Sequence, residues 1–363
     1  MRLRLTAVAL AGGIATAPTS AGPLDPEATR GTLRVYADDD HVVVLSPSVA
    51  ASTALDPATS IAIDVAADAV SGASVDVLSS ASPVTVRELR VELGGRIARA
   101  LGTGGVMVAG DARVSHERDH DAARAGATLR TELTDRNLVL DLQYRIGLDL
   151  AADVAAGPGG RRISHQLLFS ASQLLGQRTV ADLIIDVSLA AGYQASPYRH
   201  VPLVDSSWPL PTWVAEQTPD QRRAVTVAGR LRRALTGRWF VTAGQRFYAD
   251  DWDLTSHTTT LDVSRQVSPR WLLGLGARGY LQDGADFYRS VYVATPMPVL
   301  RTRDRTLGPM RSLYTSLTVD RTLGERPTHL VVACGAMSIW YLDSTLQARR
   351  QALVTTVSWT SSF

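Results

Sequence analysis

The sequence contains no lysine and only one cysteine, and beyond its first residues it has no long apolar run. All its basic side chains are therefore arginine, and Cys334 has no partner for an internal disulfide. After residue 25 there is no stretch of about 18 consecutive apolar residues, which excludes membrane-spanning helices. The setting of Cys334, VVACGAM, is typical of a strand interior, so we assign it no redox role.

Net charge is also nearly absent, because 37 basic residues are balanced by 35 acidic ones. The composition gives no electrostatic argument for a nucleic-acid partner. The exclusive use of arginine has two interpretations. Arginine geometry suits the phosphates of lipopolysaccharide, whereas codon bias in a GC-rich genome would produce the same composition. We favour the codon bias.

Apolar residues are abundant but dispersed. They make up 45% of the chain, and the mean hydropathy is +0.02. A transmembrane β-barrel has this composition, because only one face of each strand meets lipid and the other can be polar. The sequence therefore favours an all-β fold over a helical one.

The first residues resemble a targeting segment. Arg2 and Arg4 precede a short apolar stretch from Leu5 to Ala17, and small residues follow as far as Ala21. This order is typical of a secretory signal peptide over residues 1–21, cleaved after Ala21. No cysteine follows the apolar stretch, so we expect no lipid anchor.

The clearest strand pattern covers residues 136–150. Strand side chains alternate between two faces, and apolar and polar residues alternate here over an unusual length. In a barrel the polar face is inside. We expect lipid contacts from Leu140, Leu142, Ile146 and Leu148, and a luminal position for Asp141, Gln143 and Arg145.

Similar alternation recurs along the chain and predicts an antiparallel up-and-down β-barrel of about 14 strands, with a range of roughly 12 to 16. The predicted strands lie near residues 58–68, 83–100, 104–117, 121–133, 136–151, 163–174, 178–193, 222–235, 238–250, 254–267, 269–283, 310–323, 328–343 and 347–363.

Connection lengths support this count. Counted from the strand at 58, the even-to-odd connections are all short, and the long insertions 152–162, 194–221 and 284–309 all follow odd strands. Bacterial barrels have short periplasmic turns and long outer loops, so this sorting of the connections supports counting the strand near 58. We expect an N-terminal periplasmic or luminal arm over 22–57 and the barrel over 58–363.

The chain ends in LVTTVSWTSSF, which alternates strictly and finishes on an aromatic residue. The pattern is typical of a closing strand paired along its whole length. Val357, Trp359 and Phe363 match the signal read by the outer-membrane barrel-assembly machinery. The alternative is that Phe363 packs at the membrane interface, where aromatic girdles are favoured.

Several motifs resemble a family of uncharacterised bacterial proteins that is usually predicted to form outer-membrane β-barrels. They are VYADDD at 35–40 with Ser46-Pro47, DAVSGASVDV at 68–77, SHERDH at 115–120, SPYRHVPL at 196–203, PDQRRAV at 219–225, FYADDWDLTSHT at 247–258 and LQDGADFY at 281–288. The resemblance implies a barrel of unknown biochemical role.

Two acidic motifs are candidate cation or ligand contacts. Asp38, Asp39 and Asp40 repel one another, so they require open water, arginine partners or a hard cation such as Ca²⁺. Solvated or arginine-paired carboxylates are the interpretation we favour, and we expect no obligatory cofactor. The second motif lies on a predicted outer hairpin and supplies Asp250, Asp251, Asp253 and His257.

Enzyme chemistry has little support at either of two places. Ser256 and His257 point to opposite faces of an extended segment, which argues against a dyad. Residues 116–121 offer His, Glu and Asp side chains without a recognisable zinc spacing. We predict a polar rim and no enzyme.

The predicted luminal face carries charges of both signs, which can cross-link the wall by ion pairs or orient solutes. They are Glu88, Arg90, Glu92, Arg96, Asp111, Arg113, Glu117, Asp141, Arg145, Asp149, Asp182, Asp186, Arg230, Arg232, Arg246, Asp262, Arg278 and Asp320.

The sequence thus predicts an integral outer-membrane barrel in contact with lipid and lipopolysaccharide. Our leading hypothesis is a channel or transport-type protein. The alternatives are a structural or assembly partner of a cell-envelope complex and, less favoured, a hydrolase at the barrel rim. No feature names a solute or an oligomeric state.

Overall fold

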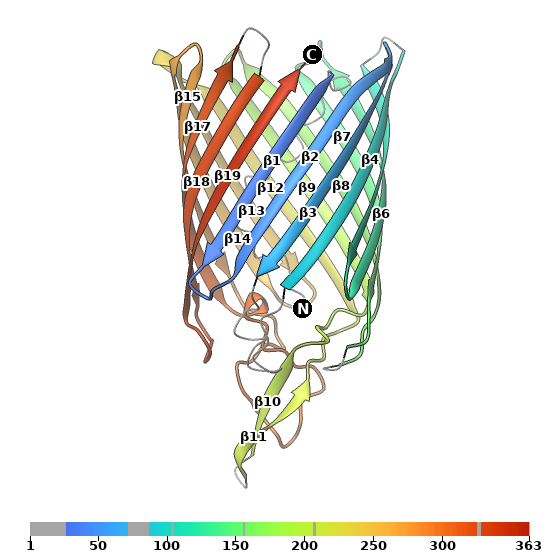
Figure 1. Ribbon diagram of the computed structural model, residues 1–363, viewed down its shortest axis with the longest axis vertical. Coiled ribbons are helices and arrows are strands. Elements are labelled where there is room, and N and C mark those ends of the chain that lie inside the picture. The colour runs from blue at the N-terminus through green and yellow to red at the C-terminus, as the bar shows by residue number, and fades with distance from the viewer. Residues whose placement is uncertain are drawn as a thin grey trace.

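The computed structural model is a closed antiparallel barrel of sixteen strands (Figure 1). The structure describes residues 27–71, 87–102, 105–154, 157–205, 208–324 and 328–362. Along these ranges, no helix has the length and apolar character needed to cross a bilayer. The barrel strands are β1 (Ala28–Asp38), β2 (Val43–Asp56), β3 (Thr59–Ser71), β4 (Arg87–Leu101), β5 (Val106–Glu117), β6 (His120–Leu133), β7 (Leu138–Ala151), β8 (Gly160–Gly176), β9 (Thr179–Gly192), β12 (Gln221–Ala234), β13 (Trp239–Asp250), β14 (Thr255–Ser268), β15 (Trp271–Gln282), β17 (Met310–Leu323), β18 (Thr328–Tyr341) and β19 (Arg349–Ser362).

Barrel strands that follow one another in the chain are neighbours in the ring, and β1 pairs with β19 to close it. At this seam Leu33 lies opposite Val357, and Gly31 lies opposite Trp359. The Trp359 indole covers Gly31, where a Cβ atom would collide with the ring. Phe363, the last residue of the predicted assembly signal, lies outside the described residues.

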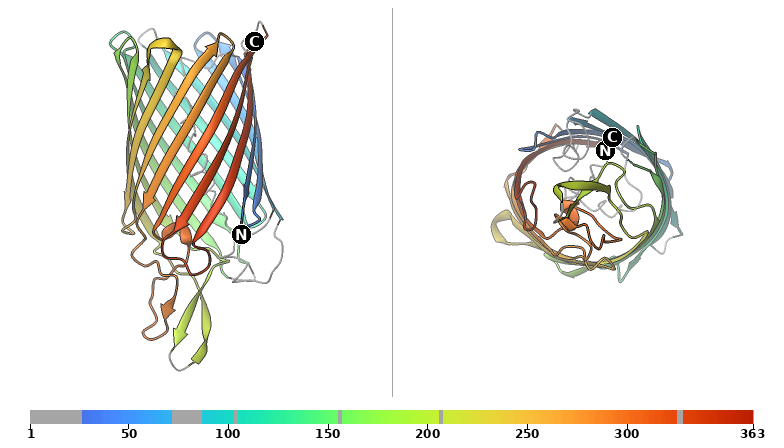
Figure 2. Two further views of the ribbon diagram at one scale, coloured as in Figure 1. Left: turned by 90° about the vertical axis from the view of Figure 1, so that its left-hand side faces the viewer. Right: turned by 90° about the horizontal axis from the view of Figure 1, so that it is seen from below.

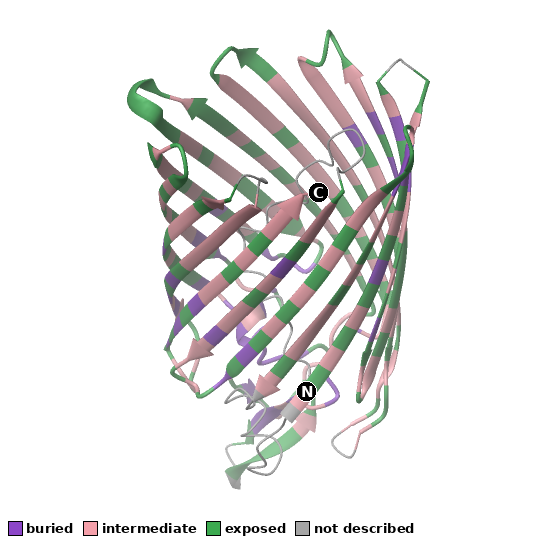
Figure 3. Cartoon of the chain, turned by 45° about the horizontal axis from the view of Figure 1, so that its top comes forward, coloured by how far each residue is buried: buried purple, intermediate pink, exposed green. Residues whose placement is uncertain are grey.

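The alternation in the sequence appears directly as two faces of the sheet. On β7, Leu142, Tyr144 and Ile146 are 44%, 45% and 42% exposed on the outward face, while Asp141, directly before Leu142 and on the inner face, is buried. The stripes of exposed and less exposed residues in Figure 3 show the same period along most strands. Period-two patterning therefore fixes which side chains point into the lumen.

The fold class is confirmed, but the barrel has sixteen strands and not about 14. Each predicted strand overlaps one observed barrel strand, and the two additional strands are β1 and β2. The predicted N-terminal arm over 22–57 is therefore corrected, because most of it forms these two strands. The predicted signal peptide over 1–21 lies outside the described residues.

Weak patterning explains why β1 and β2 were missed. The outward face of β1 includes Gly31 and Ala37, which give little apolar contrast with the luminal face. The β2 strand contains Pro47, a residue that argues against a central strand because it cannot donate a ladder hydrogen bond. Pairing on both sides overrides these local preferences.

The two ends of the barrel differ, and we call them the turn end and the loop end. At the turn end the connections are short: 57–58, 102–105, 134–137, 177–178, 235–238, 269–270 and 324–327. The 235–238 connection contains the 3-10 turn η1 (Thr236–Arg238). The loop end carries 39–42, 118–119, 152–159, 193–220, 251–254, 283–309 and 342–348, and β3 ends and β4 begins there. As predicted from the sequence, all the long connections lie at one end of the barrel, and the connections at the other end are short.

A small second sheet lies beyond the loop end (Figures 1 and 2). It has the order β11-β10-β16, formed by β10 (His200–Asp205), β11 (Trp208–Ala215) and β16 (Tyr292–Val293). A 3-10 turn, η2 (Arg305–Leu307), follows in the same long connection as β16. The sequence predicted only long loops here.

Candidate functional site

The segments 193–220 and 283–309 fold together at the loop end, and we call them the cap. Seen along the barrel axis, cap residues lie across the ring of strands (Figure 2). Strands β10 and β16 pair in parallel through Leu203 and Tyr292, so the two segments share one sheet. Val201, Leu203 and Tyr292 form a small apolar core beneath it. The cap is a folded layer and not a set of independent loops.

A buried charge network holds the two cap segments together. Arg199 Nη1 lies 3.1 Å from Glu216 Oε1 and 3.0 Å from Asp304 Oδ2. The Thr302 hydroxyl also donates to Glu216, and the Ser196 backbone N–H donates to its other oxygen at 2.6 Å. The Arg199, Glu216 and Asp304 side chains are 7%, 2% and 3% exposed. Buried ion pairs are expensive to break, so this network fixes the cap's internal geometry.

The first acidic motif forms a tight turn, which we call the Asp38 turn (Tyr36–Val42). Asp38 Oδ1 accepts hydrogen bonds from the backbone N–H groups of Asp40 and Val42, both at 3.0 Å. The Tyr36 hydroxyl donates to Asp38 Oδ2 at 2.8 Å. His41 has the positive φ of 59° that closes the turn.

The second acidic motif forms the same structure, which we call the Asp250 turn (Tyr248–Leu254). Asp250 Oδ1 accepts from the backbone N–H groups of Trp252 at 3.0 Å and Leu254 at 3.1 Å. The Tyr248 hydroxyl donates to Asp250 Oδ2 at 2.7 Å, and Asp253 has the positive φ, 63°. The repeated Tyr-Ala-Asp-Asp therefore encodes one turn at two places on the rim.

An arginine from the preceding barrel strand completes each turn. Arg222 on β12 contacts Asp250 Oδ2 through Nε at 2.7 Å and Nη2 at 2.5 Å. Arg350 on β19 lies 3.6 Å from Asp38 Oδ2 and 2.6 Å from Asp40 Oδ2. The carboxylates of Asp38, Asp40 and Asp250, predicted as cation contacts, thus contact backbone N–H groups or arginines.

The remaining residues of these motifs do not converge on one point. Asp39 accepts from the Gln351 N–H at 3.0 Å, and Asp251 accepts from the Arg223 N–H at 2.9 Å. His257 lies on the outward face of β14 with its ring edge-on to Phe247. Because His257 pairs with outward Phe247, adjacent Ser256 faces the lumen, and the two do not form a dyad.

Both turns hold the cap, each by a different chemistry. Asp40 lies 3.7 Å from the guanidinium of Arg305 in η2. Trp252 packs edge-on against Phe287 at 5.2 Å and accepts the Asp286 N–H on its carbonyl at 3.0 Å. The two turns therefore hold the cap through one of its two segments, 283–309, near opposite ends of that segment.

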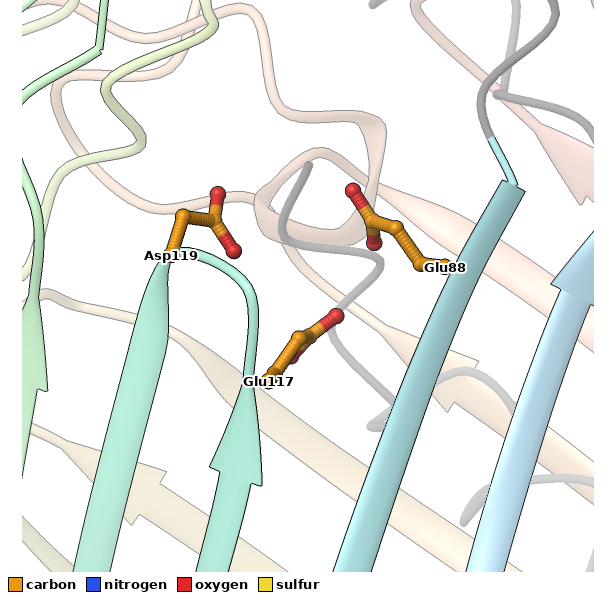
Figure 4. Close-up of side chains that lie close together, drawn as sticks. All are labelled: Glu88, Glu117 and Asp119. Carbon is orange, nitrogen blue, oxygen red and sulfur yellow. The ribbon is translucent and has the colours of Figure 1, made fainter.

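Three carboxylates approach one another at another point of the loop end (Figure 4). Glu88 at the start of β4, Glu117 at the end of β5 and Asp119 in the following turn each place one oxygen within 4.8 Å of the other two. Tyr198 of the cap donates to Asp119. An all-oxygen group of this kind could hold Ca²⁺ or Mg²⁺. The sequence grouped Glu117 with Asp119 in residues 116–121 and placed Glu88 in the lumen, but it did not join Glu88 to the other two.

The luminal wall carries the predicted charges, many of them in ion pairs between strands. Arg113 lies 2.8 Å from Asp64 and also contacts Glu92, which pairs with Arg90 at 3.1 Å. Further pairs are Arg162–Asp149 at 2.9 Å, Arg230–Asp182 at 2.8 Å and Arg232–Asp182 at 3.1 Å. The Asp111 and Arg145 side chains both lie over Gly126, and Arg96 is the cross-strand neighbour of Asp111. Ion pairing thus cross-links the wall over β3–β9 and β12.

The sequence identified these motifs but not the distant residues that their side chains contact. Arg199 lies in a motif that was noticed, but Glu216 and Asp304 gave no signal. The acids lie 17 and 105 residues from Arg199 along the chain, so only the fold brings them together.

Comparisons with known proteins agree with the fold. A family model described as "Protein of unknown function (DUF3570)" matches residues 149–331, a range that includes the cap and the Asp250 turn. A search of curated proteins finds no match. A structure described as a bacterial polysaccharide outer membrane secretin has a TM-score of 0.54 at 9% identity, covering 93% of this chain and 98% of that chain. CdiB from Acinetobacter baumannii has a TM-score of 0.54 at 8% identity, covering 94% of this chain and 60% of that one. At such identities the likeness concerns the fold alone.

Proposed function

The chain belongs to the DUF3570 family, and from this premise we propose that it is an outer-membrane transport protein with a water-filled lumen. The observation that carries the proposal is a ring of sixteen strands with a charged inner face. Barrels of about 16 to 18 strands are wide enough to leave an aqueous channel. Arg232 and Arg246 remain exposed on the luminal face, as expected of a solvated lumen.

The membrane orientation follows from the connections. Short turns lie on the periplasmic side of such barrels, so the turn end faces the periplasm and the cap faces the exterior. The predicted signal peptide supports export. Val357 and Trp359 point outward at the seam, where the barrel-assembly machinery would read them and where lipid and lipopolysaccharide would contact the strand.

In this proposal the cap restricts the outer mouth of the channel. Its buried network and its attachment to both rim turns make it a fixed constriction, because several charged contacts must break together before it can leave. We therefore expect small solutes to pass beside the cap, and we expect the cap to set the conductance.

A second candidate function is a structural or assembly partner of a cell-envelope complex. The observation that favours it is the set of exposed apolar residues on the cap. Leu210, Trp213, Val293, Met297 and Val299 are 66%, 44%, 64%, 53% and 71% exposed. Exposed apolar patches often mark protein contacts.

Planar-bilayer recording of the purified, folded protein separates the two. A transport protein gives discrete conductance steps, and these increase when Arg199→Gln and Glu216→Gln together loosen the cap. The matched control is Arg136→Gln, which removes an arginine from the Glu132 ion pair at the turn end and leaves the cap intact. Absence of conductance from wild type and from the loosened variant would reject the channel and favour the envelope partner.

A further inference from the structure

The luminal wall is divided into a charge-balanced part and a part with surplus arginine. On β3–β9 and β12, arginines and carboxylates alternate and pair. On β13–β15 the luminal charges below the rim are Arg246, Arg278 and Asp262. Among the described residues, no ion pair joins Arg246 or Arg278 to a carboxylate. The Arg246 guanidinium contacts the Thr226 hydroxyl at 3.4 Å.

The two arginines lie close together on the wall. Arg246 on β13 pairs in register with Thr258 of β14, and Arg278 on β15 pairs with Thr260 of the same strand. One strand, β14, therefore lies between them, and their partners on that strand are two residues apart. The two guanidinium groups are near enough for the charge of Arg246 to act on Arg278. Hydroxyl-bearing side chains surround them, since Thr258 is also the register partner of Tyr280, and Arg278 faces Tyr314.

Among the described residues, the carboxylates nearest by register form no ion pair with either arginine. Asp262 is two residues from Thr260 on β14, and its carboxylate lies over Gly276 of β15. Asp250, four residues from Arg246 on β13, is held by Arg222. Two like charges therefore stand together on a wall where arginines such as Arg113, Arg162 and Arg230 have acidic partners.

We propose that Arg246 and Arg278 form a luminal binding site for a divalent oxyanion such as a phosphate group. The inference rests on the proposed transport function and names its substrate class. A doubly charged oxyanion neutralises both guanidinium groups, and each can donate two parallel hydrogen bonds to its oxygens. Arginine groups in a pore select anions for the same reason.

The site is accessible from the lumen. Arg246 is exposed and Arg278 is half-buried, so an anion can reach both without displacing a strand. Arg246 is four residues from Asp250 on β13, and Arg278 is four residues from the loop-end terminus of β15 at Gln282, so the site lies between the cap and the middle of the barrel. An anion that passes the cap would meet this wall next.

Phosphate binding to the detergent-folded protein tests the site without requiring conduction. Isothermal titration with inorganic phosphate, at constant ionic strength in chloride, should show binding to wild type. Arg246→Gln and Arg278→Gln should each raise the Kd about tenfold or more, because each removes charged hydrogen bonds. Heat-modifiable gel mobility shows that each variant is folded.

Arg232→Gln is the matched control, because it removes a luminal arginine that is paired with Asp182. It should leave the phosphate Kd within about twofold of wild type, since its charge already has a partner. No phosphate binding by wild type, or equal weakening by the control, would overturn the proposal.

Reversal potentials across a bilayer in a salt gradient provide the second arm. Wild type should favour anions, and the double variant should lose this preference while Arg232→Gln retains it. Phosphate binding without any current would reject the channel and leave the site standing. Current with unchanged anion preference in the double variant would reject the site and leave the channel.

Discussion

The Asp38 turn and the Asp250 turn share the hydrogen bonds of their aspartate and tyrosine side chains, and the residue two positions after the aspartate decides how each contacts the cap. In one turn this residue is Asp40, which contacts Arg350 and Arg305. In the other it is Trp252, which packs against Phe287 and lies under the Arg222 guanidinium at 4.3 Å. The comparison shows that a fixed backbone turn can present either charge or an aromatic ring to the cap. The turn and the attachment are separate functions of one motif.

The largest expected effect comes from removing the central aspartate. Asp250→Ala should lower the free energy of unfolding by about 3–5 kcal/mol, because Arg222 then has no carboxylate among its described ion-pair partners. Asp38→Ala should cost less, about 1–3 kcal/mol, because Arg350 retains Asp40. Urea titration from lipid vesicles measures both. Equal losses would mean that Asp40 does not compensate.

The aromatic attachment should have the next largest effect. Trp252→Phe keeps an aromatic ring but loses the indole N–H that donates to the Gln221 carbonyl at 2.8 Å, so we expect a loss of about 1–3 kcal/mol. Hydrogen exchange should accelerate at residues 285–288 and stay unchanged at the Asp38 turn. Exchange that rises equally at both turns would show that they are not independent.

The charged attachment should have a smaller effect. Asp40→Asn keeps a hydrogen-bond acceptor but loses the charge that faces Arg305 and Arg350, at a cost of about 1–2 kcal/mol. Exchange should increase in η2 and remain slow at Trp252. Asp39→Asn is the control, because Asp39 accepts a backbone N–H and has no arginine partner among the described ion pairs. A change confined to residues 38–42 would contradict attachment through Asp40.

The smallest effect concerns the backbone. His41 and Asp253 both have a left-handed φ, 59° and 63°, which glycine adopts without steric cost. His41→Gly and Asp253→Gly should each change the free energy of unfolding by about 1 kcal/mol or less, in the stabilising direction. Thermal unfolding of the two variants in parallel checks this. Strong destabilisation of either would show that its side chain has a role not visible in the turn.

The barrel was largely predictable because alternation is a local signal. Residues two apart share a face, so Leu140, Leu142 and Ile146 identified the outward face of β7 without any knowledge of its neighbours. The β2 strand failed this test, because serine, alanine and Pro47 give little contrast between faces. Its place in the ring depends on pairing with β1 and β3, which no local pattern encodes.

The site was less predictable than the barrel. The sequence marked both Tyr-Ala-Asp-Asp motifs and the SPYRHVPL segment, but it did not show that the aspartates would accept backbone N–H groups. It also gave no sign that Arg199 would meet Glu216 and Asp304. The cap sheet was missed because Pro202, Pro209 and Pro211 argue against strands. Contacts between distant segments depend on the closed fold and have no periodic signature.

The pairing of β1 with β19 imposes an order of events in time. Ala28 lies opposite Ser362, so the first strand of the ring waits for the last before its second edge is satisfied. Until β19 has been made, β1 exposes unpaired N–H and C=O groups that could pair with other chains. The first barrel strand to be synthesised is therefore among the last to be paired on both sides.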